Sequence, residues 1–343
     1  MNDETSGVLD RVARSIGGLD AVERLAALSG SDFASVMLEV VRRRAARETP
    51  ASVLRRYARD RFVQPGGTPW PSARRAEDLL LGCLPADAEM VTLAPLVPLG
   101  THSALSTVSQ HKVVTAVRAC EVVADPTNAL ALEAALRRAG QPGSAGPAGQ
   151  PGPEDSAGSA GSAGPARGTV RLAAIHRVVR AQRFPDGRSA HFSLFALVTA
   201  GRDQGSGRFE RAALGEHLRF AVAALNAAGL RVQVALTPLS DPGERIVAAA
   251  AAELAAPEAA ATMADVVTDR DRTAGRGYYR DVCFKVNALV GGEPTEIGDG
   301  GFTDWTARLL SNSKERLLIS GYGLDRLAGL LEDDPTPDDP TRG

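Results

Sequence analysis

The sequence predicts an α+β protein with a helical region at its N-terminus. Apolar residues recur at three- and four-residue spacing between residues 8 and 60, which is the period of amphipathic helices. From residue 89 onward, short β-branched and aromatic runs dominate and turns separate them. The remaining helical segments are grouped around these runs, so we expect an antiparallel or mixed sheet flanked by helices.

Composition limits the classes of protein that the chain can belong to. With 343 residues and 44% hydrophobic residues it can bury a substantial core as one large or two ordinary domains. A net charge of -2 argues against a protein that coats nucleic acid. The three cysteines are far apart, which argues against a zinc site or a disulfide framework. The acidic N-terminus and the absence of a long apolar run predict a cytoplasmic protein without membrane contact.

The predicted elements follow in order. Residues 8–60 contain four helices, with Ser31-Asp32 capping the third and Thr49-Pro50 opening the fourth. Residues 89–100 and two β-branched runs after them predict short strands, and T-N-A-L-A-L-E-A-A-L-R-R predicts a helix. Two strands, a helix and a further strand come next, and then an alanine-rich helix over 245–267. A strand after Tyr278, a Gly-Gly turn, a helix over 303–311, a last strand and a last helix complete the pattern.

Residues 139–168 are rich in Gly, Pro, Ala and Ser and carry no apolar side chain larger than alanine. Such a segment cannot bury enough surface to offset the entropy of ordering, so we expect it to be disordered. Its composition alone indicates a linker between two domains. The tail over 331–343 is acidic and proline-rich, and we expect it to be frayed.

One stretch carries the strongest functional signal. V-V-R-A-Q-R-F-P-D-G-R-S-A-H-F, residues 178–192, places arginines on both arms and in the turn of a predicted hairpin. It resembles motif 2 of the class II aminoacyl-tRNA synthetases in its histidyl form, which reads Phe-Arg-x-Glu-Arg, a loop with Gly-Arg, and a strand that begins with Phe. Surface arginines of an ordinary hairpin are the alternative for any one of these positions.

Further motifs match the same family in the same order. G-Y-Y-R-D-V-C-F-K at 277–285 is similar to its Tyr-Tyr strand, and D-G-G-F-T-D-W at 299–305 to its Gly-Gly-Arg-Tyr-Asp turn. I-S-G-Y-G-L-D-R-L at 319–327 resembles motif 3, and V-V-A-D-P-T at 122–127 the loop that touches the substrate amine. Pro95 is a candidate for the motif 1 proline at a dimer interface. The resemblance implies a class II synthetase-type antiparallel sheet over residues 61–330, in which 139–168 is an insertion and not a boundary.

The resemblance implies ATP, with Mg²⁺, as the nucleotide, and gives several residues a role. Arg180 would hold the α-phosphate and the substrate carboxylate, and Arg188 would reach the γ-phosphate, since arginine offers a fixed fork of donors for developing charge. Phe192 and Arg326 would sandwich the adenine. The other residues implied at the nucleotide are Gln182 and Arg183. The residues implied at the acid are Asp125, Thr127, Tyr278, Tyr279, Leu194 and Val198.

The chain also departs from the family pattern. Leu194 and Val198 stand where the histidyl enzymes carry polar residues for the amine, so we do not expect histidine as the substrate. Gln182 replaces the motif 2 acid, and Ala274 replaces a pocket arginine that Arg276 is placed to substitute. Asp125 fits equally well as a helix cap before T-N-A-L. The pattern of His102 and His111 near serines fits ordinary polar turns better than a nucleophile and its base.

Two functions follow as hypotheses. The first is a stand-alone, homodimeric enzyme that activates an amino or carboxylic acid as an acyl adenylate for a non-tRNA acceptor. Transfer to tRNA is not expected, because no anticodon-binding domain follows Arg326 in the sequence. The second is a catalytically inactive paralogue that regulates a partner enzyme, similar to the regulatory subunit of ATP phosphoribosyltransferase. Pyrophosphate exchange into ATP separates the two.

Overall fold

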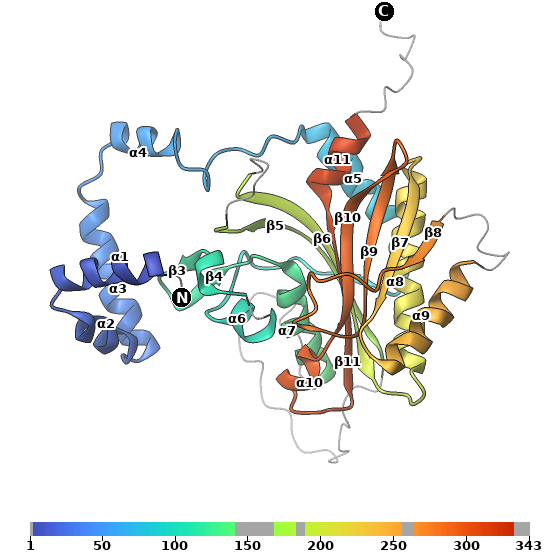
Figure 1. Ribbon diagram of the computed structural model, residues 1–343. Helices are drawn as coiled ribbons and strands as arrows, with labels where there is room; N and C mark the ends of the chain where they lie inside the picture. Colours follow the sequence, from blue (N-terminus) through green and yellow to red (C-terminus); the bar gives the residue numbers. More distant parts are fainter. Residues whose placement is uncertain (1–2, 107, 141–167, 183–188, 256–263, 333–343) are drawn as a thin grey trace, which may run out of the picture.

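The computed structural model confirms the predicted fold class: a large, mostly antiparallel sheet lies between helices (Figure 1). It describes residues 3–106, 108–140, 168–182, 189–255 and 264–332. The N-terminal helices are α1 (Asp3–Ser15), α2 (Leu19–Ala26), α3 (Gly30–Ala45), α4 (Pro50–Tyr57) and α5 (Trp70–Gly82). No helix among the described residues is long and apolar enough to cross a membrane.

The main sheet has eight strands in the order β1-β5-β6-β11-β10-β9-β7-β8. Its first half comprises β1 (Glu89–Met90), β5 (Val170–Val179), β6 (His191–Arg202) and β11 (Glu315–Gly323). Its second half comprises β10 (Glu293–Thr303), β9 (Tyr279–Val290), β7 (Arg231–Pro238) and β8 (Ala264–Thr268). The two outermost pairs, β1 with β5 and β7 with β8, are parallel, and the pairs between them are antiparallel.

Alternation along the strands builds one core on each face of the sheet. On β6, Phe195 and Leu197 pack with α8 (Arg208–Ala227), α9 (Asp241–Leu254) and α11 (Leu324–Glu332). Ala196 and Val198 point to the opposite face, where α7 (Pro126–Arg138) and α10 (Trp305–Leu309) cover them. Full burial of these side chains on both faces is what fixes the strand register.

A second, three-stranded sheet lies beside the main one. It comprises β2 (Leu96–Pro98), β4 (Cys120–Val122) and β3 (Thr115–Ala116), in that order. The short helix α6 (Thr101–Ser106) and the 3₁₀ turn η1 (Gln110–Lys112) connect its strands. Val123, directly after β4, donates its backbone N–H to the carbonyl of Pro95 and accepts one from Val179 at the end of β5. The small sheet is thereby joined to the strand that leads into the motif 2 hairpin.

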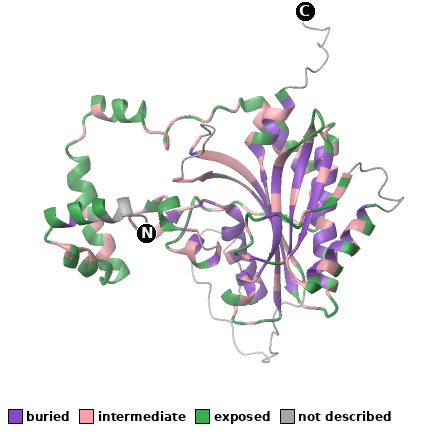
Figure 2. Cartoon of the chain, viewed as in Figure 1, coloured by how far each residue is buried: buried purple, intermediate pink, exposed green. Residues whose placement is uncertain are grey.

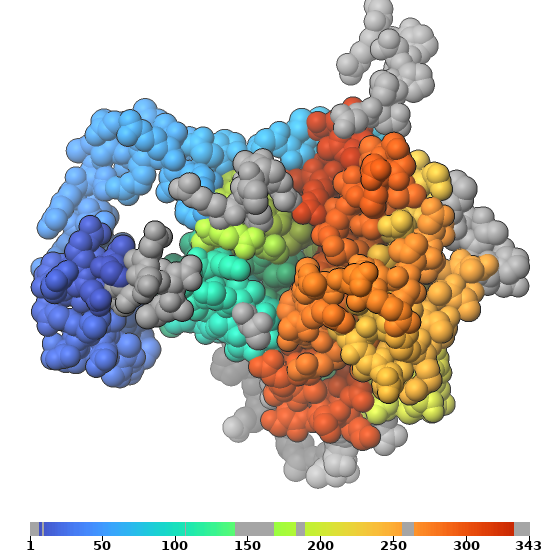
Figure 3. All heavy atoms as spheres, in the orientation of Figure 1, coloured from blue at the N-terminus to red at the C-terminus, as the bar shows by residue number. Residues whose placement is uncertain are grey.

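The N-terminal helices α1–α4 form an arm that extends away from the sheet (Figures 1 and 3). Within α2, α3 and α4, all fully described, no residue is buried, and Figure 2 shows the arm exposed along most of its length. Local contacts define these helices: Thr49 and Ser52 form a reciprocal capping box at α4. Ser29, and not the predicted Ser31, caps α3 by accepting from the backbone of Asp32.

Three expectations about individual elements are wrong. The helix predicted over 245–267 ends at Leu254, and residues 264–268 form β8, because Val266 and Val267 pair with β7 instead of continuing the helical period. Residues 299–303 lie within β10 and not in a turn. Helix α5 lies in a segment for which no element was predicted. Most of the 139–168 segment and of the acidic tail falls outside the described residues, so their predicted disorder stays a prediction.

Candidate functional site

Two adjoining cavities open on the face of the sheet near the ends of β6, β10 and β11. The first, the Phe192 lobe, has a volume of about 400 Å³ and its walls include Phe192, Leu194 and Arg326. The second, the Tyr278 lobe, has a volume of about 480 Å³ and its walls include Tyr278 and Tyr279. The residues that line both lobes are Asp125, Arg180, Asp299 and Gly321. The site is therefore one bilobed cavity with charged side chains at its waist.

Arg180 is held at this waist from several sides. It directly follows β5, and its Nε donates to the carbonyl of Ala124 at 2.9 Å. One of its terminal nitrogens lies 3.6 Å from Oδ2 of Asp125, and its guanidinium carbon lies 5.1 Å from the centre of the Phe192 ring. An arginine fixed in this way presents its remaining donors in a constant direction toward both lobes.

Arg326 projects into the Phe192 lobe from the first turn of α11. Its Nη1 donates to the backbone carbonyl of Glu296 at 2.9 Å and lies 3.5 Å from the Glu296 carboxylate. Glu296 also pairs with Lys285 at 2.9 Å. Burial alone would raise the pKa of Glu296, but these cationic partners hold it below its usual value. The β10 strand thus orients Arg326 across the lobe from Phe192.

The Tyr278 lobe has an aromatic wall. The Tyr278 and Tyr279 rings lie 4.4 Å apart, and Trp305 lies 6.0 Å from Tyr278. Burial raises the pKa of Tyr278 to about 12 and that of Tyr279 well above its usual value, so both phenols stay neutral donors near pH 7. The Tyr279 hydroxyl donates to Oδ2 of Asp299 at 3.2 Å.

Asp125 caps α7 and also lines the cavity. Its Oδ1 accepts from the backbone N–H of Thr127 at 3.0 Å and from the Thr127 hydroxyl at 2.7 Å. Its Oδ2 faces Arg180. The two alternatives for Asp125, a helix cap and a site carboxylate, are therefore compatible, because each uses a different oxygen atom. Thr127, which lines the Tyr278 lobe, is 3% exposed and acts on the site through this contact.

Asp299, the first residue of the D-G-G-F-T-D-W motif, lines both lobes, and Arg272, which no motif includes, contacts it. Arg272 is buried, and it donates from Nη2 to Asp299 at 3.0 Å and from Nη1 to the carbonyl of Phe284 at 2.9 Å. Burial raises the pKa of Asp299, and the charge of Arg272 opposes the rise. The partner that the sequence offered, Arg276, is exposed and lines neither lobe. Arg272, two residues before Ala274, contacts the cavity carboxylate Asp299 instead, although it lines neither lobe itself.

Several predicted site residues lie elsewhere than expected. Val198 is fully buried in the core under α7 and lines neither lobe. Leu194 is on the same strand, β6, but only the end of the strand where Leu194 lies reaches the cavity. Gln182, implied at the nucleotide, lines the Tyr278 lobe, and Leu194, implied at the acid, lines the Phe192 lobe. Arg183 and Arg188 fall outside the described residues.

A segment that precedes the core closes one side of the Phe192 lobe. We call residues 61–68 the strap. Arg61 donates to the carbonyls of Ala181 and Gln182, His191 contacts the carbonyl of Gln64, and the Thr68 hydroxyl donates to Asp325 at 2.6 Å.

The strap passes close to the hairpin at Gly66, where a Cβ would meet the end of the exposed Arg177 side chain and require that side chain to move. Gly66, Gly67 and Thr68 all line the lobe. Asp325 also accepts from the backbone of Ser193 at 2.5 Å, so the strap, β6 and α11 meet at one carboxylate. No sequence pattern indicated this wall, because its contacts join residues far apart in the chain.

The donor set does not form a metal site by itself. Among the described residues, no group of three or more His, Cys, Asp or Glu side chains is placed to hold a metal ion. Gln182 stands at the position of the motif 2 acid. A Mg²⁺ ion that accompanies ATP is usually held by one or two carboxylates together with the phosphates, so the Mg²⁺ that the resemblance implies stays a prediction.

Comparison with known proteins establishes the fold. No protein-family model matches the chain, and no curated protein matches its sequence. Among similar solved structures is an ATP phosphoribosyltransferase regulatory subunit/histidyl-tRNA synthetase from Bacillus halodurans, at 15% identity and a TM-score of 0.53, covering 79% of this chain and 83% of that one.

Two further structures resemble the chain to the same degree. The histidyl-tRNA synthetase of S. aureus is 13% identical with a TM-score of 0.51, covering 79% of this chain and 67% of that one. A histidine–tRNA ligase subunit from Alicyclobacillus acidocaldarius is 15% identical with a TM-score of 0.51, covering 79% and 96%. The core has the class II synthetase-type fold. At this identity the likeness shows the fold alone and leaves both proposed functions open.

Proposed function

We propose that this chain binds ATP in the Phe192 lobe and an amino or carboxylic acid in the Tyr278 lobe, and joins them as an acyl adenylate for an acceptor other than tRNA. The observation that carries the proposal is the waist of the cavity. Arg180 lines both lobes there, so one guanidinium reaches the place where the α-phosphate and the substrate carboxylate would meet.

The chemistry that this arrangement supports is an in-line displacement. A carboxylate oxygen of the acid attacks the α-phosphorus, the new O–P bond forms, and the bond to the β-phosphate breaks as pyrophosphate leaves. Negative charge develops on the α-phosphate oxygens, and preorganised donors in a partly desolvated cavity stabilise it. Arg180 supplies those donors, and its bond to Ala124 fixes their direction.

Each lobe has side chains that complement one of the two substrates. Phe192 and Arg326 line one lobe from β6 and α11, which suits an adenine stacked on a ring and a guanidinium. In the other lobe, Asp125 and Asp299 suit an ammonium group beside the aromatic wall of Tyr278. Leu194, on β6, contributes an apolar side chain to the wall of the Phe192 lobe.

Pyrophosphate exchange into ATP tests the proposal across a panel of amino and carboxylic acids. We expect exchange with at least one acid, and Arg180→Ala should lower its rate by about 10²–10³-fold, as for the loss of one transition-state donor. Arg231→Ala is the matched control, because Arg231 forms an exposed pair with Asp265 on the far side of the sheet. No ATP binding by the wild-type chain would refute the proposal.

The second candidate is a catalytically inactive regulatory subunit. The position of Gln182 in place of an acid favours it, as does the structural likeness to the Bacillus halodurans ATP phosphoribosyltransferase regulatory subunit/histidyl-tRNA synthetase. It predicts that the site binds ATP or an amino acid with no exchange for any acid in the panel, and that ligand binding changes the activity of a co-purifying enzyme. Exchange with any acid removes this candidate.

A further inference from the structure

A buried histidine lies in the wall of the Tyr278 lobe, next to the waist of the cavity. His102 is 1% exposed on α6, and both of its ring nitrogens have partners. Nδ1 lies 2.6 Å from Oε1 of Glu121, and Nε2 accepts the backbone N–H of Ala124 at 3.0 Å. Since the Ala124 amide can only donate, Nε2 carries no proton, and the ring proton is on Nδ1, facing Glu121.

Glu121 is the fixed end of this arrangement. It is fully buried on β4, and its carboxylate accepts from the backbone amides of Gly100 at 3.0 Å and His102 at 2.8 Å. Gln110 donates to the same carboxylate at 3.1 Å. Burial alone would raise the pKa of Glu121, but these donors hold it below its usual value, so the group stays ionised. A buried carboxylate with all of these donors is a rigid anchor.

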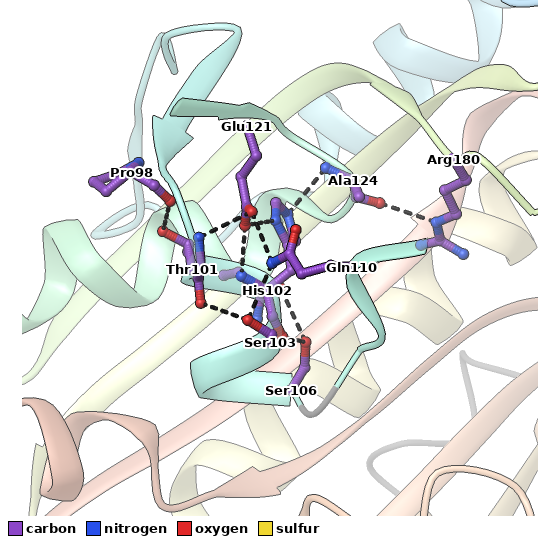
Figure 4. Close-up of polar contacts among 11 residues, drawn as sticks. Pro98, Thr101, His102, Ser103, Ser106, Gln110, Glu121, Ala124 and Arg180 are labelled. Carbon is purple, nitrogen blue, oxygen red and sulfur yellow. Dashed lines mark hydrogen bonds and ion pairs between the residues drawn. The ribbon is translucent and has the colours of Figure 1, made fainter. Parts of the chain in front are cut away.

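The chain of contacts ends at the site. The backbone N–H of Ala124 donates to Nε2 of His102, and its carbonyl accepts from Nε of Arg180. Asp125, the next residue, faces the same guanidinium. Figure 4 shows Glu121, His102, Ala124 and Arg180 as a continuous row between the small sheet and the end of β5. The peptide at Ala124 is therefore clamped on both sides, by the histidine and by the arginine.

We propose that His102 and Glu121 are positioning residues for Arg180, acting through the Ala124 backbone. The effect of this positioning on catalysis rests on the proposed function. The positioning of Arg180 itself is a property of the unliganded protein. By its sequence pattern alone, His102 fits an ordinary polar turn. Its burial, its fixed tautomer and its place behind Arg180 assign it this role instead.

Two substitutions separate the two contacts of the histidine. His102→Gln retains an acceptor near the position of Nε2, for the Ala124 amide, and gives up the Nδ1 donor. His102→Asn retains a donor near Nδ1, for Glu121, and gives up the acceptor. His217→Asn is the matched control, because His217 is also fully buried with both nitrogens bonded, to Thr199 and Ser320, on the α8 side of the sheet.

The direct readout is the Nε–H resonance of Arg180 in protein labelled with ¹⁵N-arginine, assigned with Arg180→Lys. We expect water exchange of this proton to accelerate about tenfold in His102→Asn, the equivalent of losing about one hydrogen bond. His102→Gln should stay within about threefold of wild type, and His217→Asn should leave the resonance unchanged. If His102→Asn does not fold, Glu121→Asp, which withdraws the carboxylate from His102, should accelerate exchange about threefold.

The proposal is overturned if Arg180 exchanges at the wild-type rate in His102→Asn, or if His217→Asn accelerates it equally. A second arm titrates ATP against each variant by calorimetry. Binding about tenfold weaker in His102→Asn, with recovery in His102→Gln, extends the positioning to the ligand. Absence of ATP binding by wild type refutes the proposed function alone, since the Arg180 resonance still decides the positioning.

Discussion

The N-terminal arm and the sheet core are stabilised in different ways. The arm helices are defined by caps and by i,i+3 and i,i+4 ion pairs, such as Glu39 with Arg42 and Arg43. Most of the exposed large hydrophobic side chains among the described residues lie in the arm or shortly after it, before residue 71. The core is defined by burial on both faces of the sheet. Equivalent substitutions in the two regions should therefore differ widely in cost.

The largest difference should come from truncating an apolar side chain. Phe195 is fully buried and stacks on Phe220 with 5.3 Å between ring centres, so Phe195→Ala should lower the free energy of unfolding by about 3–5 kcal/mol. Leu54 on α4 is 67% exposed, and Leu54→Ala should change it by less than about 0.5 kcal/mol. Denaturant unfolding measures both. A comparable loss for Leu54→Ala would show that a partner covers the arm.

Glycine positions offer a second contrast. A Cβ at Gly301 on β10 would lie 2.5 Å from Cδ1 of Tyr279 and 2.9 Å from Cβ of Cys283. Gly301→Ala should cost about 1–3 kcal/mol and displace Tyr279 from the wall of the Tyr278 lobe. A Cβ at Gly30 on α3 meets nothing within 4 Å, so Gly30→Ala should be neutral or slightly stabilising. Thermal unfolding of both variants decides between these outcomes.

Acid should weaken the core through a buried histidine. Burial lowers the pKa of His217 to about 3, whereas an unfolded chain returns it to about 6.5. The unfolded state therefore binds more protons below about pH 6.5, and the stability that neutral His217 contributes is complete above that pH and falls as the pH drops toward 3. The free energy of unfolding should fall by about 1 kcal/mol between pH 6 and pH 5. His217→Gln should flatten this slope, and an unchanged slope would contradict the assignment.

The smallest effect should come from the α4 cap. Thr49→Ala removes the side-chain oxygen that accepts from the Ser52 backbone, and should weaken that helix by about 1 kcal/mol. Since no residue of α4 is buried, the global unfolding transition should not move. Hydrogen exchange should therefore accelerate at α4 and stay constant in β6. Faster exchange in β6 would mean that the arm and the core unfold together.

The same contrast explains what the sequence could and could not predict. Fold class and most strands followed from the period of the apolar residues, and the shared cavity of Arg180, Phe192 and Arg326 followed from the resemblance of their motifs to one family. The strand at 264–268 was missed because its β-branched residues follow an alanine-rich helix and show their pairing only against β7. Arg272, Glu121 and the strap were missed because their partners come from distant elements and no spacing rule connects them.

Val198 and Gln182 show the limit of carrying a motif from position to position. Both occupy expected places in the sequence pattern, yet one packs under α7 and the other faces the neighbouring lobe. Whether a side chain reaches a cavity depends on how far along its strand the covering helix extends, and a linear motif contains no such information.

The strap gives the pocket an unusual border. Residues 61–68, which precede the first strand of the sheet, supply part of the enclosure around Phe192 and Arg326. A ligand bound in the Phe192 lobe would therefore contact the segment that connects helices α1–α4 to the core. Trimming the chain up to Tyr57 spares this border, whereas trimming it a few residues further would leave the lobe open to water on that side.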